Sequence, residues 1–260
     1  MRLDGRIAVI TGASRGIGRQ MALDMAAAGA AGIVVAARST AKLDALAADV
    51  RATGVACRVV TADAAREADC RAIIDAALEE FGRVDVLVNN LGIAGPTGYA
   101  RDLALEDWNA VLATNLTSAF LCAKFALDDM MRRRSGVILN ISSISGKRPL
   151  AQRLPYAVSK MAMVGLTRTL AQEVGPFGIR VNCISPGSVI GERSEEVFDL
   201  MAGANNISRE EWIDRVRSWS PLGEMVTEQD ITRMAIYLAS DFGAHMTGQD
   251  INVTAGIVMS

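Results

Sequence analysis

The sequence predicts an α/β fold in which a doubly wound, parallel, seven-stranded sheet carries helices on both faces. Seven apolar runs rich in valine and isoleucine recur along the chain, and segments with helical periodicity lie between them. Runs that are apolar on both sides are typical of buried parallel strands. These runs are Ile7–Ile10, Ile33–Val35, Val55–Val60, Val84–Val88, Val137–Ile141, Ile179–Ile184 and Ile251–Val253.

The bulk composition predicts a soluble globular protein with a single domain over residues 1–260. Half of the residues are hydrophobic and 22% are charged, and no linker, repeat or low-complexity tract divides the chain. A net charge of −2 gives no electrostatic reason to expect nucleic acid or an anionic membrane as a partner.

The four cysteines favour reduced thiols and a cytoplasmic location. They are widely separated, without the paired spacing that zinc or redox sites need, so no metal site is expected. The first predicted strand begins within a few residues of Met1, which leaves no room for a signal peptide.

A glycine-rich turn, Thr11–Gly18, follows the first run and leads into a helical segment. This order points backbone N–H groups and the positive end of a helix at a ligand, which favours a phosphate. The glycine spacing differs from the common G-x-G-x-x-G fingerprint, and Gly12–Gly16 also matches the G-x-S-x-G turn of serine hydrolases. A tight turn without a ligand is the third interpretation, so the turn alone does not decide.

Two arginines favour NADP(H) over NAD(H), although NAD(H) remains possible. Arg38 follows the second run about twenty residues beyond the turn, where an acid would bind the ribose of NAD and an arginine the 2′-phosphate of NADP. Arg15 adds a second cation on the same side. A solvated surface charge is the alternative for Arg38. Asp63, after the third run, is placed either to bind the adenine amino group or to cap a helix.

The fifth run ends in a serine-rich segment that contains Ser143. Tyr156 lies thirteen residues later, and Lys160 follows on the same face of a helix that Pro155 is expected to open. An isolated Y-x-x-x-K pattern is common by chance. Here it begins a helix at the edge of the sheet where ligands of such folds bind, which makes it a candidate site.

Taken together, these motifs resemble those of the short-chain dehydrogenase/reductase family, which has a Rossmann-like fold. The resemblance covers essentially the whole sequence, and its specificity lies in the order and spacing of the motifs. They are Thr11–Gly18, Asp63, Asn89–Gly92, Asn115, Ser143, Tyr156 with Lys160, Pro186-Gly187 and Thr247–Gln249.

The resemblance implies an oxidoreductase that interconverts a carbonyl and a secondary alcohol on a small substrate. Ser143 and Tyr156 would hold the substrate oxygen, and Tyr156 would deliver the proton. A free phenol has a pKa of about 10, which the Lys160 ammonium would lower towards neutrality. Lys160 would also bind the nicotinamide ribose, and Asn115 would hold a water linking Lys160 to solvent.

The resemblance also implies a set of cofactor-binding residues. They are Gly12, Ser14, Arg15, Gly16, Ile17, Gly18, Arg38, Asp63, Asn89, Asn90, Gly92, Tyr156, Lys160, Pro186, Gly187 and Val189. Three positions depart from the family pattern: Gly191 stands where threonine is frequent, Leu91 where alanine is usual, and Thr254-Ala255-Gly256 where aspartate-glycine-glycine is usual.

The segment from 188 to 222 is expected to cover the substrate with two short helices. Arg153 or Arg193 would meet an anionic substrate group, with a solvated surface charge as the alternative for Arg193. By analogy with the family, the chain is expected to form a homotetramer or a homodimer.

Four other functions remain open at this stage. Within enzymes they are a 3-oxoacyl-carrier-protein reductase and an NAD-linked polyol or sugar dehydrogenase. Outside this chemistry they are a non-catalytic nucleotide sensor and a serine hydrolase built on Ser14 and His245, the single histidine.

Overall fold

Seven parallel strands form one sheet in the computed structural model, which describes residues 1–259 except for the side chains of Glu192 and Arg193. The strand order is β3-β2-β1-β4-β5-β6-β9. These strands are β1 (Ile7–Thr11), β2 (Gly32–Ala37), β3 (Ala56–Thr61), β4 (Val86–Asn89), β5 (Gly136–Ile141), β6 (Ile179–Pro186) and β9 (Asp250–Val253). Each predicted run becomes a strand, so the predicted fold is confirmed.

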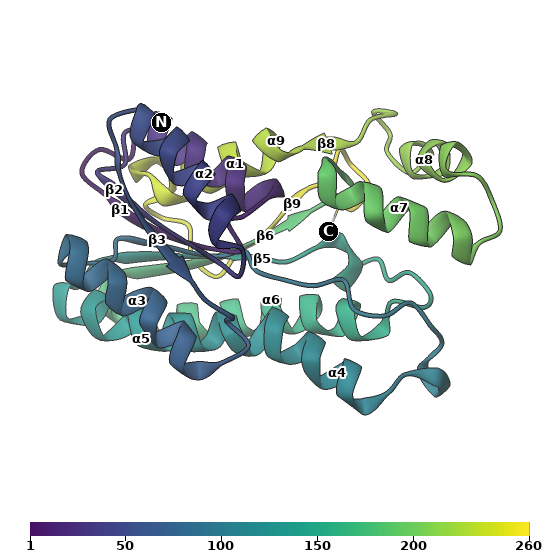
Figure 1. Cartoon of the computed structure of the whole chain (residues 1–260), viewed down its shortest axis with the longest axis horizontal. Helices are drawn as coiled ribbons and strands as arrows, with labels where there is room; N and C mark the ends of the chain where they lie inside the picture. Colours follow the sequence, from purple (N-terminus) through teal and green to yellow (C-terminus); the bar gives the residue numbers. More distant parts are fainter. Residues whose placement is uncertain (260) are drawn as a thin grey trace.

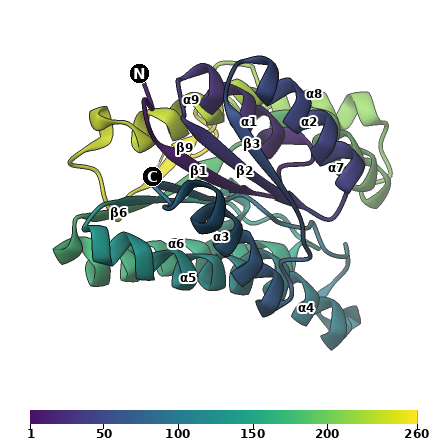
Figure 2. The same cartoon turned by 60° about the vertical axis from the view of Figure 1, so that its left-hand side comes forward.

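Helices cover both faces of the sheet (Figures 1 and 2). One face carries α1 (Gly16–Ala27), α2 (Thr40–Ala52) and α9 (Glu228–Ala239). The other carries α3 (Glu67–Phe81), α4 (Leu105–Leu112), α5 (Ser118–Arg133) and α6 (Leu154–Val174). Successive side chains of the strands point into opposite layers: Ala8 and Ile10 join the first apolar core, and Val9 joins the second.

Proline and glycine set the helix boundaries that position the site. Pro155 occupies the first turn of α6, where its missing N–H costs no hydrogen bond, and the helix ends before Gly175-Pro176. At the end of α3, Gly82 has φ +76°, a left-handed conformation that glycine adopts without strain.

A buried carboxylate network ties the beginnings of two strands to the end of α5. Asp85 accepts the backbone N–H of Ile7 at 2.8 Å, and Asp129 accepts that of Val84 at 3.1 Å. Arg133 joins the two acids, with Nε 2.8 Å from Asp129 and Nη1 3.1 Å from Asp85. The network therefore fixes the edge of the sheet opposite the carboxyl ends of the strands.

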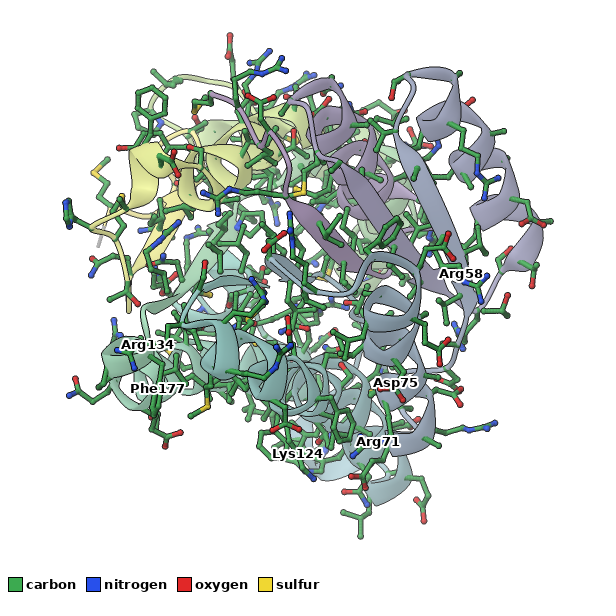
Figure 3. All side chains as sticks on the ribbon, turned by 90° about the vertical axis from the view of Figure 1, so that its left-hand side faces the viewer. Arg58, Arg71, Asp75, Lys124, Arg134 and Phe177 are labelled. Carbon is green, nitrogen blue, oxygen red and sulfur yellow. The ribbon has the colours of Figure 1, made fainter. Side chains whose placement is uncertain are left out.

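The stretch Leu105–Arg133 is long and apolar enough, by composition, to cross a membrane. Half of its most apolar window is buried inside the fold, as in a core helix of a globular protein. The outer surface beside it is charged: Arg71 of α3 and Lys124 of α5 lie near each other in Figure 3, with their cationic groups 4.1 and 5.2 Å from the centre of the Phe125 ring.

The four cysteines are buried and free, which agrees with the interpretation as reduced thiols. Burial raises the pKa of Cys57 to about 11 and that of Cys183 to about 12. Both thiols are therefore protonated at neutral pH, and they are poor nucleophiles.

The segment from 188 to 222 contains two helices, as predicted: α7 (Glu192–Ala204) and α8 (Arg209–Ser218). They enclose a small apolar core of their own around Phe198, Met201, Trp212 and Val216. A two-stranded parallel sheet, β7 (Val189–Ile190) with β8 (Val226–Thr227), anchors this segment. The sequence did not predict this sheet, because two residues are too few to show a strand period.

Candidate active site

The glycine turn leaves an open space above the first residue of α1. Gly12 and Gly16 have φ values of +66° and +59°, and Asn90 Nδ2 fixes the turn by donating to the carbonyls of Thr11 and Gly12 at 3.0 and 3.1 Å. A Cβ on Gly16 would meet no atom closer than 3.7 Å, that atom being Glu228 Oε1. A phosphate can therefore approach the backbone and the positive end of α1.

A continuous cavity of about 650 Å³ runs from this turn to Tyr156. All but two of the predicted cofactor-binding residues line it. They are Gly12, Ser14, Arg15, Gly16, Ile17, Arg38, Asp63, Asn90, Gly92, Tyr156, Lys160, Pro186, Gly187 and Val189. The residues present thus fit an extended dinucleotide, with phosphates at the glycine turn and the reacting end beside Tyr156.

The two exceptions are Asn89 and Gly18, which are placed behind the cavity wall. The buried Asn89 Nδ2 donates to Asn140 Oδ1 at 2.9 Å, so this amide joins β4 to β5 instead of contacting a ligand. A Cβ on Gly18 would lie 2.4 Å from the Gly12 carbonyl oxygen, so this glycine allows close packing of α1 against the turn. Neither residue lines the cavity, so their direct contact with a cofactor stays a prediction that this geometry does not support.

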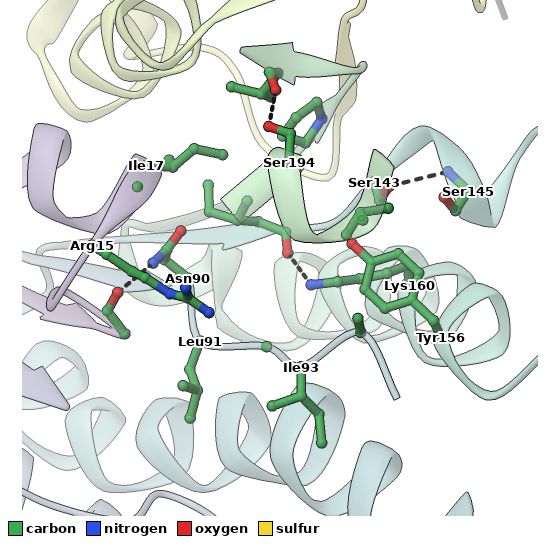
Figure 4. Close-up of a pocket in the computed structure, with 18 of the residues that line it drawn as sticks. Arg15, Ile17, Asn90, Leu91, Ile93, Ser143, Ser145, Tyr156, Lys160 and Ser194 are labelled. Atoms are coloured by element: carbon green, nitrogen blue, oxygen red, sulfur yellow. Dashed lines mark hydrogen bonds between the residues drawn. The ribbon is translucent and has the colours of Figure 1, made fainter. Parts of the chain in front are cut away.

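Ser143, Tyr156 and Lys160 meet at the far end of the cavity (Figure 4). Lys160 is only 3% exposed, and its Nζ donates to the Ile141 carbonyl at 2.8 Å and lies 5.8 Å from the centre of the Tyr156 ring. The Ser143 hydroxyl accepts the backbone N–H of Ser145 at 3.1 Å. Because that bond uses an acceptor position, the Ser143 proton can be donated to a substrate oxygen.

Asn115 is fully buried, in a π-helical turn (Ala113–Thr117) between α4 and α5. Its side chain accepts from the Ile93 N–H at 2.7 Å and donates to the Ile93 carbonyl and to Ser159 Oγ, both at 3.0 Å. It therefore holds the loop after β4 against α6, one layer behind the cavity wall. Its role in holding a water beside Lys160 stays a prediction.

The two arginines differ in their surroundings. Arg38 is exposed at the adenosine end of the cavity and makes no ion pair within the described residues. Asp63 lines the same end, and its carboxylate accepts the Ala65 N–H at 3.2 Å in a local turn. Arg15 pairs with Glu196 of α7: Nη1 lies 2.6 Å from Oε1, and Nη2 lies 3.2 Å from Oε2.

Another part of the cavity lining is an apolar wall with two cations. Its apolar residues are Leu150, Val197, Phe198, Met201, Trp212, Val216 and Trp219. The guanidinium of Arg148 lies 4.1 Å from the Trp219 ring, and that of the buried Arg153 lies 4.9 Å from the Tyr156 ring. The side chain of Arg193 lies outside the described residues, so only Arg153 of the two predicted arginines is placed here.

Several of these wall residues were missed by the sequence analysis. Arg148 and Leu150 follow a strand end but belong to no motif, and Phe198 and Met201 belong to a helix whose inner face depends on how it docks. An apolar periodicity in α7 was the available signal, and it does not tell core from cavity wall.

The serine-hydrolase interpretation finds no support in this arrangement. Ser14 lines the cavity after β1, whereas His245 is exposed in the segment before β9, at the opposite edge of the sheet. No group of three histidine, cysteine, aspartate or glutamate side chains suited to a metal ion occurs in the described part of the chain.

Comparison with known proteins finds similarity over nearly the whole chain. A family model described as Enoyl-(Acyl carrier protein) reductase matches residues 12–258. The 3-oxoacyl-(acyl-carrier-protein) reductase of Synechocystis sp. is 35% identical, with 99% of this chain and 98% of that protein covered. A crystal structure of an actinorhodin polyketide ketoreductase variant with NADPH superposes with a TM-score of 0.93, at 34% identity and 99% coverage of both chains. NAD⁺-bound xylitol dehydrogenase superposes with a TM-score of 0.94, at 28% identity, covering 98% of this chain and 100% of that one.

Proposed function

Because the chain belongs to the short-chain dehydrogenase/reductase family, we propose that it is an NADP(H)-dependent oxidoreductase that interconverts a carbonyl group and a secondary alcohol on a small substrate. The observation that carries this function is the meeting of Ser143, Tyr156 and Lys160 at one end of the cavity that begins at the glycine turn. A protein that only binds a nucleotide would need the glycine-turn end of the cavity and not these three side chains.

Ser143, Tyr156 and Lys160 have different roles in the proposed reduction. When bound, the nicotinamide supplies the hydride. The Ser143 hydroxyl and the Tyr156 phenol donate hydrogen bonds to the carbonyl oxygen as it gains negative charge, and Tyr156 gives up its proton to that oxygen. Lys160, held by the Ile141 carbonyl, places a buried positive charge beside the ring and so stabilises the phenolate that remains. Oxidation reverses these steps.

Changing Arg38 to aspartate is expected to reverse the cofactor preference. The substitution removes a cation from the 2′-phosphate position and supplies the acid that binds a ribose hydroxyl, so NADPH affinity should fall at least tenfold while NADH affinity rises. Titration of both reduced cofactors by fluorescence measures the effect, with Arg58→Asp, on the neighbouring strand β3 and outside the cavity lining, as the matched control. If the native chain bound NADH as tightly as NADPH, the assignment of Arg38 would be wrong.

A 3-oxoacyl-carrier-protein reductase is the second candidate, since the match to the Synechocystis protein favours it. A panel of carbonyl and alcohol substrates, followed by NADPH absorbance, tests both functions. The panel should include free ketones, polyols, and 3-oxoacyl groups attached to carrier protein or to a short thioester. Turnover of the carrier-bound form alone would favour the second candidate. Turnover of no carbonyl or alcohol would contradict the enzyme function.

We also propose a homotetramer in the cytoplasm. Apolar side chains are exposed on the outer faces of α4, α5 and α6, and a second copy would bury them. They are Leu105, Phe120, Val158 and Met161. Light scattering is expected to give the mass of four chains, and Phe120→Glu to give smaller species. A native monomer would contradict the proposal.

The four buried free thiols support the proposed location in a reducing compartment such as the cytoplasm.

A further inference from the structure

The Arg15–Glu196 ion pair joins two parts of the site that are far apart in the sequence. Arg15 immediately precedes α1 and lines the adenosine end of the cavity, whereas Glu196 belongs to α7 of the substrate-covering segment. The two terminal guanidinium nitrogens of Arg15 each donate to a different carboxylate oxygen of Glu196. Glu196 thus uses the donor pair of Arg15 that suits a phosphate equally well.

We propose that Glu196 competes with the 2′-phosphate of NADP(H) for Arg15, so that the attachment of α7 to the glycine turn depends on which dinucleotide is bound. This inference rests on the proposed cofactor site. A phosphate monoester carries a charge of about −1.5 to −2 at pH 7 and presents three acceptor oxygens, more than one carboxylate offers. The 2′-hydroxyl of NAD(H) has no such charge and leaves the ion pair in place.

The ion pair has a mechanical consequence because α7 and α8 form one unit. Arg209 of α8 lies 3.3 Å from Glu195 and 3.6 Å from Asp199, and the two helices share an apolar core. Val197 and Phe198, next to Glu196 in the chain, line the substrate end of the cavity. Loss of the Glu196 contact therefore removes one attachment of the wall against which the substrate must fit, while β7 and β8 still anchor the segment.

The test compares two nucleotides that lack nicotinamide, adenosine 2′,5′-bisphosphate and 5′-AMP, by calorimetry on the full chain. Glu196→Gln is expected to tighten binding of the bisphosphate by about two- to fivefold, the range of an exposed ion pair, and to leave 5′-AMP unchanged. Glu195→Gln removes the same charge one residue away from a carboxylate that pairs with Arg209, so it is the matched control. In the Arg15→Gln background the gain from Glu196→Gln should disappear.

A second readout follows the unit formed by α7 and α8, through two tryptophans at α8. Trp212 and Trp219 form an edge-to-face pair in the segment, so native fluorescence should respond to the bisphosphate and not to 5′-AMP, and Glu196→Gln should abolish that difference. Unchanged or weaker bisphosphate binding in Glu196→Gln would overturn the inference, as would an equal gain for 5′-AMP or a gain that persists without Arg15. If neither nucleotide bound the native chain, the cofactor site itself would be wrong.

Discussion

Replacing Tyr156 with phenylalanine is expected to lower kcat by about 100- to 10,000-fold while the dissociation constant of NADPH stays nearly unchanged. The substitution deletes one oxygen, which is the atom that gives the proton to the substrate. Ring packing against Arg153 and Lys160 is retained, so the cavity keeps its shape. Initial rates followed by NADPH absorbance and a separate fluorescence titration of the cofactor measure the two quantities.

Tyr99→Phe is the matched control for this experiment. Tyr99 is 58% exposed and lies outside the cavity lining, so loss of its hydroxyl should leave turnover unchanged. Retention of more than about a tenth of the native kcat in Tyr156→Phe would reject Tyr156 as the proton donor. A parallel loss of NADPH affinity would instead indicate that the phenol mainly holds the cofactor.

The second large effect concerns stability, at the edge of the sheet away from the site. Asp129→Ala is expected to lower the free energy of unfolding by about 2–4 kcal/mol. The change leaves the buried Val84 N–H without its acceptor and removes one of the two acids that Arg133 binds. The cost is below that of isolating a charge, because Arg133 keeps Asp85 and the Val84 carbonyl. Urea denaturation measures the loss.

Asp128→Ala separates this effect from the general cost of changing α5. Asp128 precedes Asp129 in the same helix but is exposed, so its removal should change the free energy of unfolding by less than about 0.5 kcal/mol. NADPH affinity should be unaffected in both variants, since the network lies at the other edge of the sheet. Equal stability of the two variants would show that the network contributes nothing.

The residues that sequence analysis placed correctly follow from local periodicity. Tyr156 and Lys160 share a face because a helix repeats every 3.6 residues, and the strands follow from apolar runs that two helical layers must bury. Asn89 is an example of a residue whose direction local periodicity does not predict. Neighbouring residues at a strand end point to opposite sides, but which of Asn89 and Asn90 faces the cavity depends on the partner strands.

Local sequence patterns also do not predict which side chains that are distant in the sequence pair with one another. The sequence marks Arg15 as a cation beside a phosphate site, but its pairing with Glu196, 181 residues later in the chain, arises only when α7 docks. The substrate wall has the same origin, since it combines the loop around Leu150 with the inner faces of α7 and α8. Long-range packing, rather than any local pattern, determines these contacts.

The apolar core of α7 and α8 is separate from the cores of the sheet, so the two parts of the site can be changed separately. Phe198, Met201, Trp212 and Val216 form one apolar cluster, whereas separate apolar clusters hold the sheet and its covering helices together. Substitutions in the small core therefore reshape the substrate wall without weakening the nucleotide-binding framework. Replacing the segment that contains α7 and α8 is therefore expected to change the substrate preference while Ser143, Tyr156 and Lys160 stay in place.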